Sequence, residues 1–154
     1  MTILGIDPGT MITGYAIGNT ELELIDYGHL NLEDEKRMPG KLKQFNEFFY
    51  NIILDYTPDV IALETPFLGR NPRTFMSLGY LRGMVYFMCN EHTILEFSPS
   101  EAKKIVTGSG RSTKDDVARV VCGLWPELVD ERNDVTDAAS LVVCAAKTLN
   151  FNKE

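Results

Sequence analysis

The segment ILGIDPGTMITGYAIG, residues 3–18, consists of two apolar runs that are joined through a Pro-Gly turn. Apolar runs on both sides of a short turn are typical of paired strands, so we expect strands over 2–7 and 13–18. The first strand ends at Asp7, whose carboxylate then lies on a rigid strand beside a tight turn. A charge in such a place costs stability unless it has a partner, and the rest of the sequence should supply one.

The remainder of the chain alternates between strand and helix patterns. Apolar residues at helical spacing indicate helices, and short apolar runs bounded by turn residues indicate strands. The segment SPSE is typical of a helix start in which Ser98 is the cap, Pro99 the first helical residue, and Glu101 reaches back to the cap. The expected elements are strands at 22–30, 60–64 and 93–97, and helices at 42–56, 74–90, from Ser98, from the STKD segment through Leu124, and at 134–150.

The order of these elements indicates an α/β fold. Three consecutive strands predict an antiparallel meander, and the strand that ends at Glu64 should pair in parallel with the first strand. We therefore expect a mixed five-stranded sheet, with three antiparallel and two parallel strands, flanked by helices. No repeat, low-complexity segment or linker interrupts the sequence, so we expect one domain over residues 1–154.

The composition is that of a globular protein, with 44% hydrophobic and 24% charged residues. No segment approaches the roughly 20 apolar residues that cross a bilayer, and a signal-peptide pattern is absent, so we expect a cytoplasmic protein without membrane association. Cys89, Cys122 and Cys144 are odd in number and lie in apolar segments, which favours reduced thiols over disulfides or zinc ligands. His29 and His92 lack metal-ligand spacing, and we assign them no role.

The charge is unevenly distributed along the chain. A net charge of −7 argues against a nucleic-acid partner, because polyanions repel. Residues 68–119, however, carry eight Lys and Arg against five acids, a net +3 within a chain whose remainder is −10. This basic segment fits either a groove for an anion or an ordinary surface of mixed sign. Its basic residues are Arg70, Arg73, Arg82, Lys103, Lys104, Arg111, Lys114 and Arg119.

The helix expected at 74–90 is unusually apolar. Eleven of the fifteen residues from Phe75 to Cys89 are apolar, and they do not form one stripe. A helix that is apolar on nearly all sides has to be buried on nearly all sides, so one face covers the sheet and the other needs a second partner. Gly79 and Gly83, four residues apart, allow another backbone to approach closely. We favour a two-fold dimer contact here over complete burial within the monomer.

Four carboxylates occupy positions from which they could share a site. Asp7 and Glu64 end strands that we expect to be parallel neighbours, so both should emerge at one edge of the sheet. Asp134 and Asp137 are three residues apart and therefore lie on one face of the last helix. Taken singly, Asp7 fits an ordinary turn residue, Glu64 an ordinary strand end, and the helical pair a cap that complements the helix dipole. Four acids brought together would repel one another and raise one another's pKa values unless a cation lay between them.

Carboxylate ligands alone suit hard divalent ions such as Mg²⁺ or Mn²⁺. Two such ions about 3.5–4 Å apart can activate water and stabilise a leaving oxygen in phosphodiester hydrolysis. A basic strip beside them is what a phosphate-backbone substrate requires. The hypothesis from the residues is therefore that a metal is the partner of Asp7.

Five segments in this order and spacing resemble the RuvC-type Holliday junction resolvases, which belong to the ribonuclease H-like (retroviral integrase) superfamily. The segments are GIDPGT, ALETPF, SLGYLRG, VTGSGRSTK and DVTDAAS, and the resemblance covers residues 2–147. It implies a homodimeric endonuclease, dependent on Mg²⁺ with Mn²⁺ as a substitute, that holds two ions per site. Such an enzyme binds four-way DNA junctions and nicks two strands of like polarity symmetrically, leaving ligatable ends.

The resemblance also implies roles for individual residues. Asp7, Glu64, Asp134 and Asp137 match the metal-binding catalytic acids, and Lys103 matches the active-site lysine that steadies charge on the phosphate. Lys114 matches a DNA-contacting lysine. Phe67 matches the aromatic residue that stacks against bases at the crossover, with a loop anchor packed on the core as the alternative. Together with the basic segment, the expected substrate-binding set is Phe67, Arg70, Arg73, Lys104, Arg111 and Lys114.

The sequence departs from the family pattern at Met11, at Thr65 and in the DVTDAAS segment, and it carries no basic tail. None of these departures removes a catalytic acid. They lead to the hypothesis of a divergent, phage-borne member that cuts branched DNA more broadly, three-way forks included. Docking to a branch-migration complex stays open.

Three other functions compete with junction resolution. The GIDPGT hairpin also resembles the phosphate-binding hairpin of actin-like ATPases, which need a second lobe that 154 residues do not provide. A related nuclease that acts on structured RNA is the second alternative. A branched-DNA binding module without cleavage is the third, but a pure binder has no use for clustered carboxylates facing a polyanion.

Overall fold

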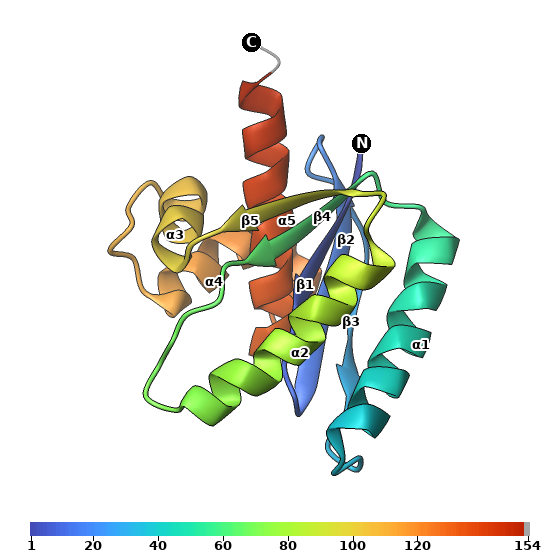
Figure 1. Ribbon diagram of the computed structural model, residues 1–154. Coiled ribbons are helices and arrows are strands. Elements are labelled where there is room, and N and C mark those ends of the chain that lie inside the picture. Colours follow the sequence, from blue (N-terminus) through green and yellow to red (C-terminus); the bar gives the residue numbers. More distant parts are fainter. Residues whose placement is uncertain (153–154) are drawn as a thin grey trace.

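The computed structural model describes residues 1–152 and contains the mixed sheet expected from the sequence (Figure 1). The five strands lie in the order β3-β2-β1-β4-β5. β1 pairs antiparallel with β2, and β2 with β3, whereas β4 is parallel to both β1 and β5. The strands are β1 (Thr2–Asp7), β2 (Ile12–Asn19), β3 (Leu24–Asn31), β4 (Val60–Glu64) and β5 (Thr93–Phe97).

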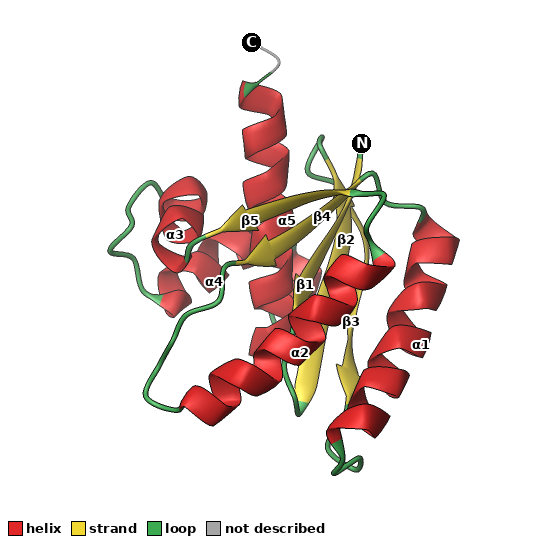
Figure 2. Cartoon of the chain, in the orientation of Figure 1, coloured by secondary structure: helices red, strands yellow, loops and turns green. Residues whose placement is uncertain are grey.

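Helices cover both faces of this sheet (Figure 2). The first two helices pack on one face and the last three on the other, and each face has its own apolar core. None of the helices within residues 1–152 is both long enough and apolar enough to cross a bilayer. The α-helices are α1 (Met38–Tyr56), α2 (Pro72–Met88), α3 (Pro99–Thr107), α4 (Lys114–Leu124) and α5 (Asn133–Phe151), and a 3-10 turn covers Pro126–Leu128.

The helix starts follow local chemistry. At α3 the Ser98 hydroxyl accepts from the Glu101 N–H at 3.2 Å, and the Glu101 carboxylate accepts from the Ser98 N–H at 2.8 Å, which confirms the predicted cap. α2 starts two residues earlier than expected, because the Asn71 side chain caps it and Pro72 fits its first position. The three cysteines are free thiols, as expected.

α5 lies unusually close to the sheet, because glycines face it from β1 and β2. A Cβ on Gly5 would lie 2.3 Å from the carbonyl oxygen of Ala138. A Cβ on Gly14 would lie 2.0 Å from the carbonyl oxygen of Asp134. The backbone of α5 therefore occupies the space that side chains would fill, and this contact fixes where the acids of α5 lie relative to β1.

α2 is not enclosed within the monomer. Among its described residues only Leu81, Arg82 and Val85 are buried. A Cβ added at Gly79 or Gly83 would meet nothing within 4 Å. Met76, Tyr80 and Phe87 of α2 are also exposed, and Tyr86 is partly so.

Candidate active site

The sheet places Asp7 and Glu64 at the same edge and on the same face. β1 and β4 are parallel neighbours, with Ile3 opposite Val60 in the register. Ile3, four residues before Asp7, belongs to the core under α5. Ala62, two residues before Glu64, belongs to the same core. Since alternate residues of a strand face the same side, both carboxylates leave the sheet toward α5.

The first turns of α5 bring Asp134 and Asp137 to that edge. Gly14 is the register partner of Asp7, and the Asp134 carbonyl lies where a Gly14 side chain would be. Asp134 is therefore held next to the end of β1 by a contact between backbones. Asp137, one turn along the helix, lies on the same helix face.

These four acids line one cavity of about 360 Å³. Two lysines from different helices, Lys103 of α3 and Lys114 of α4, also line it. Phe67, in the loop after β4, forms part of its wall. The full lining is Asp7, Glu64, Phe67, Pro99, Ala102, Lys103, Lys114, Val117, Asp134, Asp137, Ser140 and Leu141.

The cavity carries negative charge that the protein does not fully compensate. Burial, followed by the charges of Asp137, Asp134 and Glu64, raises the pKa of Asp7 from 3.8 to about 8. Loss of hydration at the cavity wall, and then Asp137, also raises the pKa of Glu64. Both shifts have the direction expected when carboxylates crowd together away from water. A bound cation would reverse them.

Two basic side chains form ion pairs with acids of the cluster. The Lys114 ammonium donates to Asp137 Oδ2 at 3.2 Å, and the charge of Asp137 raises the pKa of Lys114. The side chain of Lys114 is 81% exposed, so it is free to move toward another anion. Arg132 Nε lies 3.6 Å from Asp134 Oδ2. Arg132 was not among the residues expected from the sequence, because an arginine in an acidic connection gives no local signal of its partner.

The donor set of this cavity fits a hard divalent ion. Four carboxylates line it, and burial followed by the charges of the other three raises the pKa of Asp7, which a bound cation would offset. Within residues 1–152, no three His, Cys, Asp or Glu side chains lie close enough together, in their present positions, to hold a metal ion. The carboxylates line the cavity walls, and side-chain rotation would have to bring them onto an ion.

The structure separates the expected substrate-binding residues into two groups. Phe67 and Lys114 line the cavity, and Phe67 is 76% exposed, which excludes the alternative that it anchors its loop in the core. Four others are exposed on the surrounding surface and outside the cavity lining: Arg70, Arg73, Lys104 and Arg111.

One residue of the basic segment does not belong to a surface strip. Arg82 is only 7% exposed and forms an ion pair with Glu96. Counting charges along the sequence could not reveal this burial. The available signal was that Arg82 is the only charged residue in the apolar stretch from Phe75 to Cys89.

Comparison with known proteins gives consistent results for sequence and fold. Residues 3–145 match the family model described as "Crossover junction endodeoxyribonuclease RuvC". A protein of that name from Alkaliphilus oremlandii is 35% identical, over 99% of this chain and 97% of its own length. The protein of that name from Halothermothrix orenii is 33% identical, over 100% of this chain and 97% of its own length.

Solved structures share the fold. The structure of T. thermophilus RuvC in complex with a Holliday junction substrate superposes with a TM-score of 0.87 at 17% identity, over 98% of this chain and 96% of that one. The fowlpox virus resolvase bound to Holliday junction DNA gives 0.57 at 17% identity, over 97% and 99% of the two chains. The expected ribonuclease H-like architecture is thereby confirmed.

Proposed function

The chain belongs to the RuvC family of crossover junction endodeoxyribonucleases, and we propose that the acid-lined cavity is the centre at which it cuts DNA strands at Holliday junctions. The protein is accordingly an endonuclease of DNA recombination and repair. We assign it to the cytoplasm of a bacterial cell, phage-infected or not, where such DNA is found.

One observation carries the assignment of the site. Acids from β1, β4 and α5, segments far apart in the chain, line one cavity, and burial together with their mutual repulsion raises the pKa of Asp7 to about 8. An arrangement that costs this much electrostatic energy is unexpected for a purely structural feature, whereas perturbed carboxylates in a cleft are typical of functional sites. The lysines beside them suit a phosphate-containing substrate.

Asp7, Glu64, Asp134 and Asp137 would hold two divalent ions, for which Mg²⁺ is our proposal and Mn²⁺ the substitute. When bound, such ions lower the pKa of an attacking water and offset charge on the scissile phosphate. Lys103 is positioned in the cavity wall to neutralise charge on the phosphate. Lys114, whose exposed side chain now contacts Asp137, would bind a DNA phosphate.

Phe67 is proposed to stack on a base at the junction crossover. We expect Phe67→Ala to slow junction cleavage by about 5- to 150-fold, because stacking on an aromatic residue contributes about 1–3 kcal/mol per base. Affinity for linear duplex and the melting temperature should stay unchanged, since the ring is mostly exposed. Cleavage assays and thermal unfolding measure this, with Tyr50→Ala, an exposed aromatic of α1, as the matched control. A large drop in melting temperature would contradict this role.

We further propose that the protein is a homodimer through the outer face of α2. Met76, Tyr80 and Phe87 are exposed there, and Gly79 and Gly83 leave open space in front of the helix. A two-fold dimer would present two cavities to the two symmetric strands of a junction. The symmetry of the enzyme would then match that of its substrate.

Gly83→Glu is expected to convert this dimer into a monomer. The monomer has room for the new side chain, whereas a second backbone packed on Gly83 would clash with it and bury its charge. Light scattering after size-exclusion chromatography measures the mass, and paired nicking should fall with dimerisation. Gln44→Glu adds the same charge at an exposed site of α1 and should leave the mass unchanged. A dimeric Gly83→Glu variant would rule out this interface.

The function itself is tested with a labelled four-way DNA junction, with and without Mg²⁺, mapping nicks at nucleotide resolution. Symmetric nicks that require the divalent ion support the proposal. Three-way forks and junctions of varied core sequence test the broader substrate range. Matched structured RNA tests the RNA-nuclease alternative, and tight binding without cleavage under all metal conditions would favour the non-cleaving alternative.

A further inference from the structure

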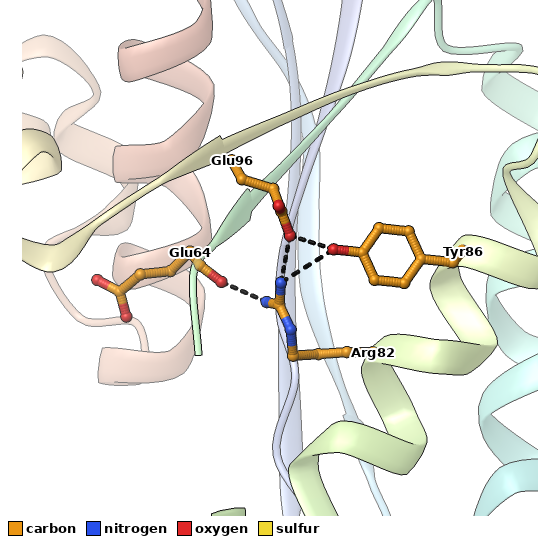
Figure 3. Close-up of polar contacts among 4 residues, drawn as sticks. All are labelled: Glu64, Arg82, Tyr86 and Glu96. Carbon is orange, nitrogen blue, oxygen red and sulfur yellow. Dashed lines mark hydrogen bonds and ion pairs between the residues drawn. The ribbon is translucent and has the colours of Figure 1, made fainter. Parts of the chain in front are cut away.

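A buried arginine contacts the backbone at the position from which Glu64 reaches the cavity. Arg82 of α2 donates through Nη1 to the backbone carbonyl of Glu64 (Figure 3). Its Nη2 pairs with the Glu96 carboxylate of β5 and lies 3.3 Å from the Tyr86 hydroxyl, which itself donates to Glu96. The guanidinium thereby links α2 to the ends of two neighbouring strands.

These contacts hold the peptide group between Glu64 and Thr65 from both sides. The Thr65 N–H donates to the Phe97 carbonyl at 2.8 Å, continuing the pairing of β4 with β5. In a trans peptide the carbonyl points the opposite way, so the Glu64 carbonyl faces away from β5. Registered pairing of β4 with β1 ends at Ala62, two residues earlier. Arg82 therefore takes the place of a strand partner for this carbonyl.

Arg82 acts from the face of the sheet opposite the cavity. Ile94, two residues before Glu96, belongs to the core under α1 and α2, which places Glu96 on that face. The Glu64 carboxylate lines the cavity on the α5 face. Figure 3 shows the two ends of Glu64 pointing apart, with its carbonyl toward Arg82 and its carboxylate away from it. Arg82 can therefore fix the main chain of Glu64 without occupying the cavity.

We propose that Arg82 is a positioning residue, which orients Glu64 toward the cavity by holding the Glu64–Thr65 peptide against β5. The role of Glu64 in cleavage rests on the proposed function. The chain has few other restraints here, because Thr65 begins the exposed loop that carries Phe67. Loss of the Arg82 contact would let this peptide rotate and move the Glu64 carboxylate relative to the other three acids.

An arginine suits this task better than a lysine. Its planar fork donates in two fixed directions at once, here to a carbonyl on β4 and a carboxylate on β5. A lysine would keep the positive charge, but its ammonium group sits on a flexible chain and cannot donate to both oxygens in the same fixed geometry. The two substitutions Arg82→Lys and Arg82→Met therefore separate geometry from charge.

The test compares Arg82→Lys and Arg82→Met with wild type in single-turnover cleavage of a four-way junction at saturating protein, with Mg²⁺ titrated. We expect the cleavage rate to fall about 10- to 100-fold, as for residues that orient metal ligands, and the half-saturating Mg²⁺ concentration to rise. Junction affinity, measured with chelator present, should stay unchanged. In the metal-free protein the ¹³C chemical shift of the Glu64 carbonyl should move in both variants.

Two further variants serve as controls. Tyr86→Phe keeps both contacts of Arg82 to the strands and should lose less activity than either Arg82 variant. Lys43→Met removes a cation from an exposed position of α1 and should change nothing. If Arg82→Met does not fold, the test uses Arg82→Lys alone, because this variant retains the buried charge.

An unchanged cleavage rate and Glu64 carbonyl shift in the Arg82 variants would overturn the proposal. So would a loss of activity that follows only from unfolding or from dissociation of a dimer, as measured by melting temperature and light scattering. A wild-type protein that cuts no junction would refute the proposed function instead, and the carbonyl shift would still report on the Arg82 contact.

Discussion

Asp7→Asn is expected to reduce junction cleavage by about three orders of magnitude or more while leaving junction binding intact. Removal of one catalytic group from a set that acts as a unit abolishes most of the rate enhancement. Asparagine has nearly the same shape as aspartate, so the cavity and the lysines beside it should persist. Single-turnover cleavage in Mg²⁺ and binding in chelator measure the two effects separately.

The same substitution should stabilise the metal-free protein. Asp7 has a pKa of about 8 in the folded protein against an ordinary value of 3.8. Between these values the unfolded chain has lost the Asp7 proton and the folded protein keeps it, so wild-type stability falls as pH rises from about 4 to about 8. Asparagine cannot ionise and lacks this cost. The melting temperature in chelator should therefore be higher for Asp7→Asn at pH 8, by about 2–4 °C for each kcal/mol relieved.

The difference in melting temperature should be small near pH 4 and vanish below about pH 3, where Asp7 is protonated in both states, and it should shrink when Mg²⁺ saturates the wild type. Asp34→Asn, at an exposed position, provides the control for loss of one negative charge. If the Asp7→Asn variant cleaved junctions at the wild-type rate, Asp7 would not be a catalytic residue. Equal melting temperatures at every pH would mean that burial and the neighbouring carboxylates do not raise the pKa of Asp7.

Gly14→Ala is expected to disrupt both the fold and the cavity. Its Cβ would lie 2.0 Å from the Asp134 carbonyl oxygen and 2.8 Å from the Val135 nitrogen, so α5 would have to move away from β2. Overpacking of this kind costs about 3 kcal/mol at the upper end of the usual range. Because a misplacement of about 1 Å can cost 100-fold in rate, we expect cleavage to fall by at least about that factor.

Denaturant unfolding and junction cleavage check this prediction. Gly123→Ala is the matched control, because Gly123 lies exposed in α4 and an added Cβ would meet nothing within 4 Å. That variant should be stabilised by about 0.5–1 kcal/mol, as expected for alanine in place of glycine in a helix. A Gly14→Ala protein with wild-type stability and activity would show that α5 does not approach β2 as closely as described.

Much of the fold was predictable because its signals are local. Two apolar runs and the DPGT turn predicted the β1–β2 hairpin, and the pairing of Ser98 with Glu101 predicted the start of α3. These features depend on residues that are neighbours in the chain, so a sequence carries them directly. The observed ends of several helices and strands differ from the expected ones by one to four residues. At α2, for example, the cap formed by Asn71 sets where the helix begins.

The placement of the candidate site residues depended on contacts between distant segments. The sequence indicated which acids belong together, but the approach of α5 to Gly14, which holds Asp134 beside the end of β1, arises from packing across more than a hundred residues. The burial of Arg82 is of the same kind. Along the chain it counts as one more basic residue, and only the neighbouring strands β4 and β5 make it a buried contact for the Glu64 backbone. Side-chain chemistry and local periodicity are properties of adjacent residues, whereas distance and burial arise only when helices and strands pack against one another.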